Sequence, residues 1–291
     1  MLRVALSSVV LAWVLFSGPR CKAADQADKS LAVINAGISS AEDSPFASSN
    51  YHFLPGDYVY VTFEISGFAI RSTNRDETKT ISLAFEVTPQ DNSGKPLAAP
   101  DSGEIKTELA PEDKNWVPKR RASFLLPSFL AAGPFRIHIV VKDVAANAET
   151  SRDIPFLVGG TQLEPSSSIT VENFRFLRAP NDNAPLDVAA YSPGDTVYAR
   201  FDMAGYQNGP GYRHSVSYSV HVIAPNGKPY IDDSDAANLD SSSFYPAQFI
   251  PGDLALKTSK DSLHGSYLLI LTVRDLIGNQ QFEFKQSFSI E

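Results

Sequence analysis

The residues able to perform acid–base or nucleophilic chemistry are few in this chain. The sequence of 291 residues contains five histidines and one cysteine. His138 and His221 each stand between apolar residues of an alternating segment, so their side chains should point outward. His52, His214 and His264 fall in or near loops. No two of the five have a spacing typical of metal ligands, and we expect solvated surface imidazoles.

Short catalytic motifs are also missing from the sequence. It has no Gly-x-Ser-x-Gly, no Ser-x-x-Lys, no phosphate-binding Gly-Lys-Ser/Thr and no His-Glu-x-x-His. A triad assembled from distant residues would leave no such motif, so a hydrolase remains a third possibility. A cleft that gathered His214 or His264 with a carboxylate would favour it.

One acidic segment could bind calcium. Asp232, Asp233 and Asp235 supply three carboxylates within four residues, and carboxylate oxygens are the ligands that calcium prefers. The segment matches no defined calcium loop, and an acidic, solvated turn is the simpler interpretation. No other cofactor is indicated.

The segment 111–121 has the composition of a partner-binding surface. It contains Trp116, the only tryptophan after residue 23, followed by Lys119, Arg120 and Arg121. A tryptophan beside cations can anchor a partner protein, a sugar ring or an anionic polymer. The alternative is a loop whose tryptophan covers the edge of a domain and whose three basic residues begin an outward-facing strand.

Two further segments place tyrosines among small polar residues. Tyr206 and Tyr212 enclose Gln-Asn-Gly-Pro-Gly, and Tyr245 follows Ser-Ser-Ser-Phe. Exposed tyrosine beside glycine, asparagine and serine is typical of adaptable binding loops and also of ordinary hairpin tips. These three tyrosines join Trp116 and the basic residues as candidate partner-binding residues.

An internal repeat predicts the elements that position these side chains. Residues 55–68 recur as 193–206 at a constant offset of 138. Each copy has a Pro-Gly-Asp turn followed by alternating apolar residues, which predicts a half-buried strand. The residues predicted to face the core are Val59, Val61, Phe63 and Ile65 in the first copy and Val197, Ala199, Phe201 and Met203 in the second.

Two more segments repeat in the same order. An alternating segment precedes Gly-Lys-Pro at 94–96 and again at 227–229. Later, Gly-x-aromatic-x-aliphatic-x-aliphatic-x-Val-x-Asp ends at Asp143 in one copy and at Asp275 in the other, each before an asparagine and a last strand. Aspartate and asparagine bond to nearby backbone in turns, which explains both positions without a metal.

This last pattern resembles the penultimate hairpin of bacterial immunoglobulin-like and fibronectin-III-like domains. The resemblance implies a sandwich of about seven strands with Greek-key pairing. The absence of a cysteine pair and of a tryptophan in a core strand excludes an antibody-type domain. We therefore predict an all-β protein of two tandem immunoglobulin-like antiparallel β-sandwich domains, a fold that hosts many functions and carries over no catalytic residue.

The N-terminal residues 1–23 have the pattern of a signal peptide. Arg3 precedes an apolar run that ends at Phe16, and small residues follow near Ala23. The run is short for a membrane span, although an uncleaved anchor is an alternative. Lipidation of Cys21 is another, poorly supported because Arg20 stands where such signals place small residues. We expect domains at 24–159 and 168–291, joined by a linker at 160–167.

The net charge of the expected mature chain excludes some classes of binding partner. Loss of residues 1–23 removes three basic residues and no acid, which takes the formal net charge from −8 to −11. Such a surface should repel nucleic acid and anionic lipid, and no later segment could form an integral membrane span.

The predicted function is a non-catalytic, secreted or periplasmic interaction or structural module of the cell envelope or exterior, with a protein or glycan partner. A carbohydrate-binding protein, with Trp116 or the tyrosine loops as stacking platforms, is the alternative. A hydrolase with a site between the domains is less favoured.

Overall fold

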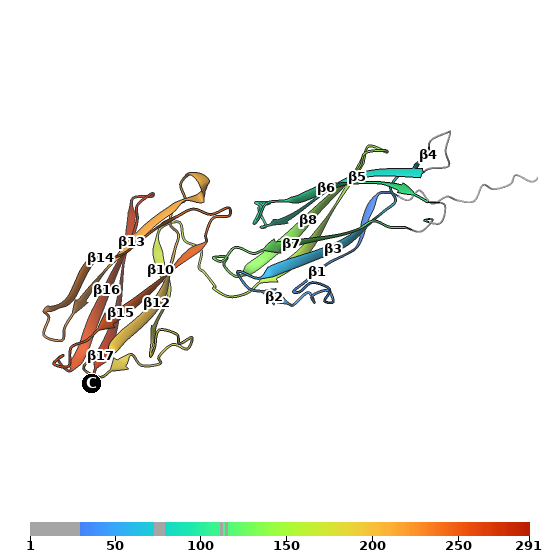
Figure 1. The fold of residues 1–291 in the computed structure, drawn as a ribbon. Helices are drawn as coiled ribbons and strands as arrows, with labels where there is room; N and C mark the ends of the chain where they lie inside the picture. Colours follow the sequence, from blue (N-terminus) through green and yellow to red (C-terminus); the bar gives the residue numbers. More distant parts are fainter. Residues whose placement is uncertain (1–29, 73–78, 111–112, 114–115) are drawn as a thin grey trace, which may run out of the picture.

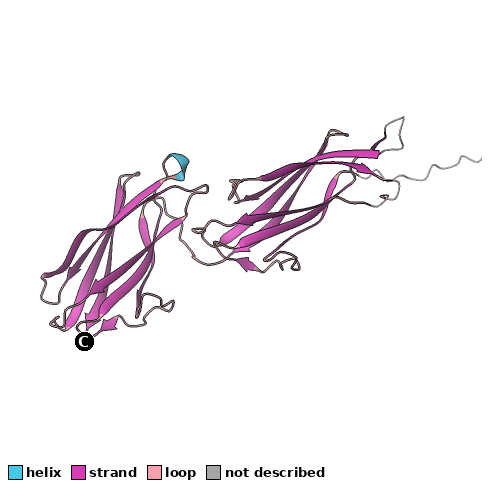
Figure 2. Ribbon diagram, viewed as in Figure 1, coloured by secondary structure: helices cyan, strands magenta, loops and turns pink. Residues whose placement is uncertain are grey.

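The chain folds into two β-sandwiches, one after the other (Figure 1). The computed structural model describes residues 30–72, 79–110, 113 and 116–291, so the predicted signal peptide and Cys21 lie outside the described residues. Strands make up all the regular structure of these residues except one short 3-10 turn, η1 (Pro210–Tyr212) (Figure 2). No helix in these ranges is long and apolar enough to cross a membrane. The predicted fold class is confirmed.

The first sandwich packs a sheet of order β1-β3-β7 against one of order β2-β9-β8-β5-β4, in which β6 also pairs with β5. Its strands are β1 (Ala32–Ser39), β2 (His52–Phe53), β3 (Tyr58–Ser66), β4 (Arg71–Ser72), β5 (Lys79–Gln90), β6 (Asp101–Leu109), β7 (Lys119–Leu125), β8 (Gly133–Asp143) and β9 (Ala148–Val158).

The second sandwich repeats this arrangement with sheets of order β10-β12-β15 and β11-β17-β16-β13-β14. One short pair in each domain, β2 with β9 and β11 with β17, is parallel, within sandwiches whose other strand pairs are antiparallel as predicted. The strands are β10 (Thr170–Leu177), β11 (Ala190–Tyr191), β12 (Thr196–Ala204), β13 (His214–Ile223), β14 (Pro229–Ser241), β15 (Phe249–Lys257), β16 (Gly265–Asp275) and β17 (Gln280–Ile290).

The two cores lie between the sheets of each sandwich, where the repeat predicts them. All eight core residues predicted on β3 and β12 are at most 1% exposed. Because successive side chains of a strand point to opposite faces, the alternating sequence places one complete set inside. Burial of each large apolar side chain stabilises the fold by roughly 1.5–3 kcal/mol.

The Pro-Gly-Asp turns close in the same way in both domains. The carboxylate of Asp57 accepts a hydrogen bond from the Leu54 N–H at 2.8 Å, and that of Asp195 accepts one from the Ser192 N–H at 2.9 Å. The glycine between proline and aspartate has a positive φ in each turn, 86° and 95°. Glycine adopts this conformation without steric cost, which accounts for its place in the repeat.

The repeated aspartates at the ends of β8 and β16 are structural. Asp143 and Asp275 are each 1% exposed, and each carboxylate accepts hydrogen bonds from two N–H groups of the turn that follows. Each also accepts one from a distant loop, Asp143 from the Ala69 N–H at 2.6 Å and Asp275 from the Gln207 N–H at 2.8 Å. The aspartate therefore ties the loop after β3 or β12 to the last hairpin, a contact that local sequence did not predict.

Candidate interaction surfaces

Loops of the two sandwiches meet at a junction that combines backbone and aromatic contacts. The Gln248 N–H donates to the Phe129 carbonyl at 3.0 Å, and the Ala131 N–H donates to the Gln248 side-chain oxygen. Beside these bonds, the rings of Phe129 and Phe249 pack edge to face with centroids 5.9 Å apart. The start of β15 is therefore held against the loop between β7 and β8.

Tyr245 extends the junction into the first domain. Its side chain is 5% exposed and packs with the buried residues of the first core. The hydroxyl donates to the carboxylate of Asp91 at 3.1 Å. Burial raises the pKa of Tyr245, and the neighbouring Asp91 carboxylate adds to the shift. Hydrogen bonds, including those from Ser93 and the Lys95 N–H, outweigh burial and lower the pKa of Asp91.

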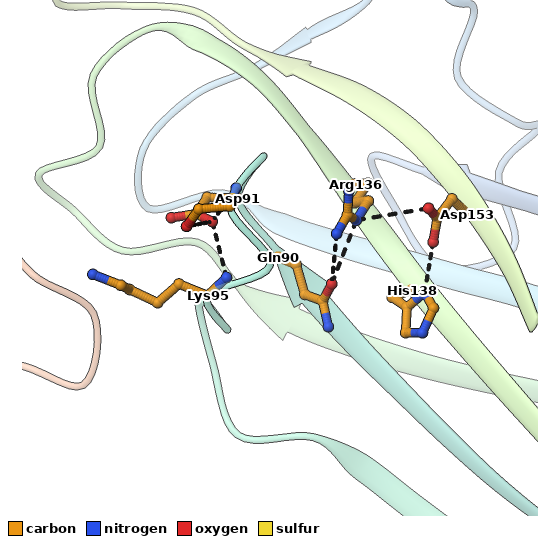
Figure 3. Close-up of polar contacts among 7 residues, drawn as sticks. Gln90, Asp91, Lys95, Arg136, His138 and Asp153 are labelled. Carbon is orange, nitrogen blue, oxygen red and sulfur yellow. Dashed lines mark hydrogen bonds and ion pairs between the residues drawn. The ribbon is translucent and has the colours of Figure 1, made fainter.

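The Asp91 loop follows directly from a line of polar contacts across the sheet β2-β9-β8-β5-β4 of the first sandwich (Figure 3). The guanidinium of Arg136 on β8 donates to the Gln90 side-chain oxygen at 3.3 Å and lies 3.7 Å from the carboxylate of Asp153 on β9. That carboxylate also contacts His138 Nδ1 at 2.6 Å. His138 is thus on the outer face, as predicted, and the contacts fix the strand end from which the Asp91 loop begins.

Tyr206 and His214 lie together beneath the junction. Tyr206 is 8% exposed and its hydroxyl donates to the Ala247 carbonyl at 2.6 Å. The His214 ring is 5.8 Å from it, 7% exposed, and its Nδ1 is buried without a hydrogen-bond partner. Burial lowers the pKa of His214, although nearby Asp240 opposes the shift. The prediction of a solvated imidazole is wrong for His214, because this residue begins β13 and its ring lies beside that of Tyr206.

All three loop tyrosines make contacts within the chain. Tyr206 and Tyr245 are buried, so the expectation of exposed rings is wrong for both. Tyr212 is half-buried at a positive φ of 51°, and the Lys95 ammonium of the first domain lies 5.0 Å from its ring centroid. A cation over an aromatic face is attracted by the ring quadrupole. Binding of an outside partner by these tyrosines stays a prediction.

A pocket of about 550 Å³ opens at the junction between the loops of the two domains. His214 lines it together with serines of the β14–β15 segment. The nearby carboxylate of Asp240 pairs with Arg213 and not with His214. The Ser243 hydroxyl likewise donates to the Tyr245 carbonyl and not to His214. Within the described ranges, no hydrogen bond joins His214 to a serine or a carboxylate. This arrangement gives no support to a hydrolase site between the domains.

Trp116 lies at an exposed end of the first domain. Its side chain is 39% exposed. Lys119 of β7 pairs with Glu64 of β3, and Pro251 of β15 pairs with Asp202 of β12. Glu64 and Asp202 are equivalent residues of the repeat, so Lys119 and Pro251 occupy equivalent positions. Trp116 and Gln248 each stand three residues earlier, so they are structural counterparts. Gln248 of the second domain contacts the first domain. The equivalent position of the first domain holds the exposed Trp116.

The three basic residues after Trp116 point to opposite faces of β7, because side chains alternate along a strand. Lys119 and Arg121 are exposed, and Arg121 pairs with Asp43 at 2.6 Å. Arg120 is half-buried on the core side, where its guanidinium lies 5.1 Å from the Phe85 ring centroid. The interpretation of three outward-facing cations is therefore wrong for Arg120. Of the three, Lys119 and Arg121 are exposed on the outer face of β7, which begins three residues after Trp116.

The three aspartates considered for calcium lie on the edge strand β14 and not in a turn. Asp232 is 3.6 Å from His221 on β13, and Asp233 accepts a hydrogen bond from the Asp235 N–H at 3.2 Å. Neighbouring residues of a strand point to opposite faces, which separates Asp232 from Asp233. In the part of the chain that the structure describes, no three acidic, histidine or cysteine residues could hold one metal ion. Calcium binding stays a prediction.

Similarity of this chain to known proteins is found among solved structures. No family model matches it, and no curated protein does. Similar solved structures include the C-terminal domain of the Streptococcus agalactiae AgI/II polypeptide BspA, with 8% identity over 87% of this chain and 99% of that one, at a TM-score of 0.28. The native conformation of E. coli alpha-2-macroglobulin has 9% identity over 91% of this chain and 17% of that one, also at 0.28. Scores this low establish neither a family nor a function.

Proposed function

We propose that this protein is a non-catalytic, exported interaction or structural module, and that the exposed end of its first domain around Trp116 binds a protein partner. The observation that carries the proposal is the equivalence of Trp116 and Gln248. At this position the second domain already contacts a protein surface. The first domain presents a larger, apolar side chain there, 39% exposed.

The chemistry of this end fits an interface. Tryptophan buries a large area at a small cost in side-chain entropy and is enriched at positions that dominate binding energy. Arg121 and Lys119 lie on the same strand beyond it and suit a partner with acidic groups. Export rests on the N-terminal sequence pattern.

The junction suits a module that presents this end at a fixed distance from the rest of the chain. Tyr245, Phe249 and Gln248 fasten the second sandwich through both apolar and hydrogen-bonded contacts. Such a contact restrains the domains more than the linker alone would.

The test is capture from an envelope fraction with the full chain, followed by crosslinking from a photoreactive residue at position 116. Trp116→Ala should abolish saturable capture. Phe282→Ala is a matched control, because Phe282 is 37% exposed on β17 in the second domain. Capture that survives Trp116→Ala, or a crosslink that forms only elsewhere, would overturn the proposal. A glycan-array signal lost on Trp116→Ala would instead favour carbohydrate binding.

A further inference from the structure

The pocket at the junction is distinct from the Trp116 end and is lined mainly by apolar side chains from both domains. The first domain contributes residues of the β5–β6 and β7–β8 segments, and the second contributes the β14–β15 segment. Its main apolar residues are Leu97, Ala98, Leu125, Phe129, Phe244 and Ala247.

Large apolar side chains stay exposed around this pocket. Phe244 is 56% exposed, Leu125 51% and Phe129 40%. Exposed apolar side chains gathered around one pocket are unfavourable in water. Such surfaces typically mark a site at which a bound partner or ligand covers them. Phe129 stays 40% exposed although its ring also packs against Phe249 in the junction.

The polar part of the lining is uncharged. None of the residues that line the pocket is an aspartate, glutamate, lysine or arginine. Four serines, Ser128 and residues 241–243, line it together with His214 and Tyr245. An ion would lose its hydration there without gaining an opposite charge, so the lining selects against charged ligands.

We infer that this pocket binds an uncharged, mainly apolar small molecule, with an alcohol or carbonyl group placed at the serines. Its volume of about 550 Å³ lies within the range of small-molecule sites, roughly 300–1,000 Å³. Because both domains supply the lining, the site exists only when the domains are docked. This inference does not depend on the partner proposed for Trp116.

Fluorescence titration of the full chain with Nile red, an uncharged apolar dye with a carbonyl group, tests the inference. We expect saturable binding at one site per chain. 1-Decanol should displace the dye, whereas decanoate and decylammonium should compete at least about tenfold more weakly because the lining offers no opposite charge.

Two variants locate the site. Ser242 is exposed on the pocket wall, so Ser242→Trp should fill the opening and abolish binding without disturbing either core. Phe244→Ser should weaken binding roughly tenfold by removing apolar contact. Ser287→Trp, at an exposed position of β17 near the C-terminus, is the matched control and should bind as the unaltered chain does.

Three results would overturn the inference. They are the absence of saturable binding, equal competition by decanol and decanoate, and unchanged binding in a folded Ser242→Trp variant. A chain that is dimeric until Ser242→Trp makes it monomeric would also contradict it, because the pocket would then be an interface between copies.

Discussion

Corresponding ends of the two sandwiches have opposite surroundings. In the second domain, Tyr245 and Gln248 at the start of β15 are packed on the first domain. In the first domain, the counterpart of Gln248 is Trp116, which is exposed. The same position of one fold thus makes a contact within the chain in one copy and offers an aromatic surface in the other.

The opposite ends of the sandwiches differ as well. Before β8, the first domain has Leu125 and Phe129 in the segment that receives the second domain. The corresponding segment before β16 has Lys257 and Asp261 at the positions of Leu125 and Phe129, although its Leu263 is 48% exposed. Leu125 and Phe129, which receive the second domain, therefore have charged counterparts in that domain. The shared strands set the fold of both domains, while the loops decide which ends associate.

The largest expected effect tests whether the two domains are equivalent. Asp143→Ala and Asp275→Ala each remove a buried carboxylate that accepts three backbone hydrogen bonds. Each should lower the free energy of unfolding of its own domain by about 3–5 kcal/mol. Urea denaturation of the full chain, followed by domain-specific probes, measures the loss. A large loss in one domain and none in the other would break the structural equivalence.

The next prediction contrasts the docked end with the exposed one. Tyr245→Ala leaves a cavity in the first core and removes the Asp91 hydrogen bond, so it should cost about 3 kcal/mol and widen the distribution of interdomain distances. Trp116→Ala should change stability by no more than about 0.5 kcal/mol. Thermal unfolding and small-angle scattering measure both. Equal costs would show that Trp116 packs as tightly as Tyr245 does.

Alkaline pH should weaken the contact that Tyr245 makes at the junction. Burial raises the pKa of Tyr245 above its ordinary value of 10.0, so folding favours the protonated hydroxyl. Its contribution is complete below about pH 10 and is lost as pH rises through the folded-state pKa. Interdomain distance measured from pH 8 to 12 should increase, and Tyr245→Phe should reduce this dependence. An identical profile in Tyr245→Phe would assign the effect to other groups, foremost Tyr206, whose pKa burial also raises.

The smallest effect concerns the charge beside Trp116. Arg121→Ala breaks an exposed ion pair with Asp43 and should cost no more than about 0.5 kcal/mol, because water screens such pairs. The affinity for the partner should fall more clearly and depend on salt. A fall in stability larger than the fall in affinity would assign Arg121 to the fold of the first domain.

The core face and the turns of the repeated segments were predictable because they depend on residues close together in the sequence. The alternation that buries Phe63 and Phe201, and the turns at Asp57 and Asp195, follow from backbone geometry within a few residues. The candidate site was predictable only in part. Composition singled out Trp116, whose exposure the structure shows, but the inward turn of Arg120 depends on the register of β7 against β3.

The sequence by itself determined two copies of one sandwich, the core face of each main strand and the places where the copies differ. Tertiary structure alone decided what the differing loops contact. Tyr245 and Asp91 are 154 residues apart, and no local pattern encodes that pair. His214 and Tyr206 are buried within the second domain, beside each other and near the Ala247 carbonyl, in contacts that local sequence does not encode either. Local periodicity fixes the face of a strand, whereas docking depends on complementarity between surfaces that the folded domains create.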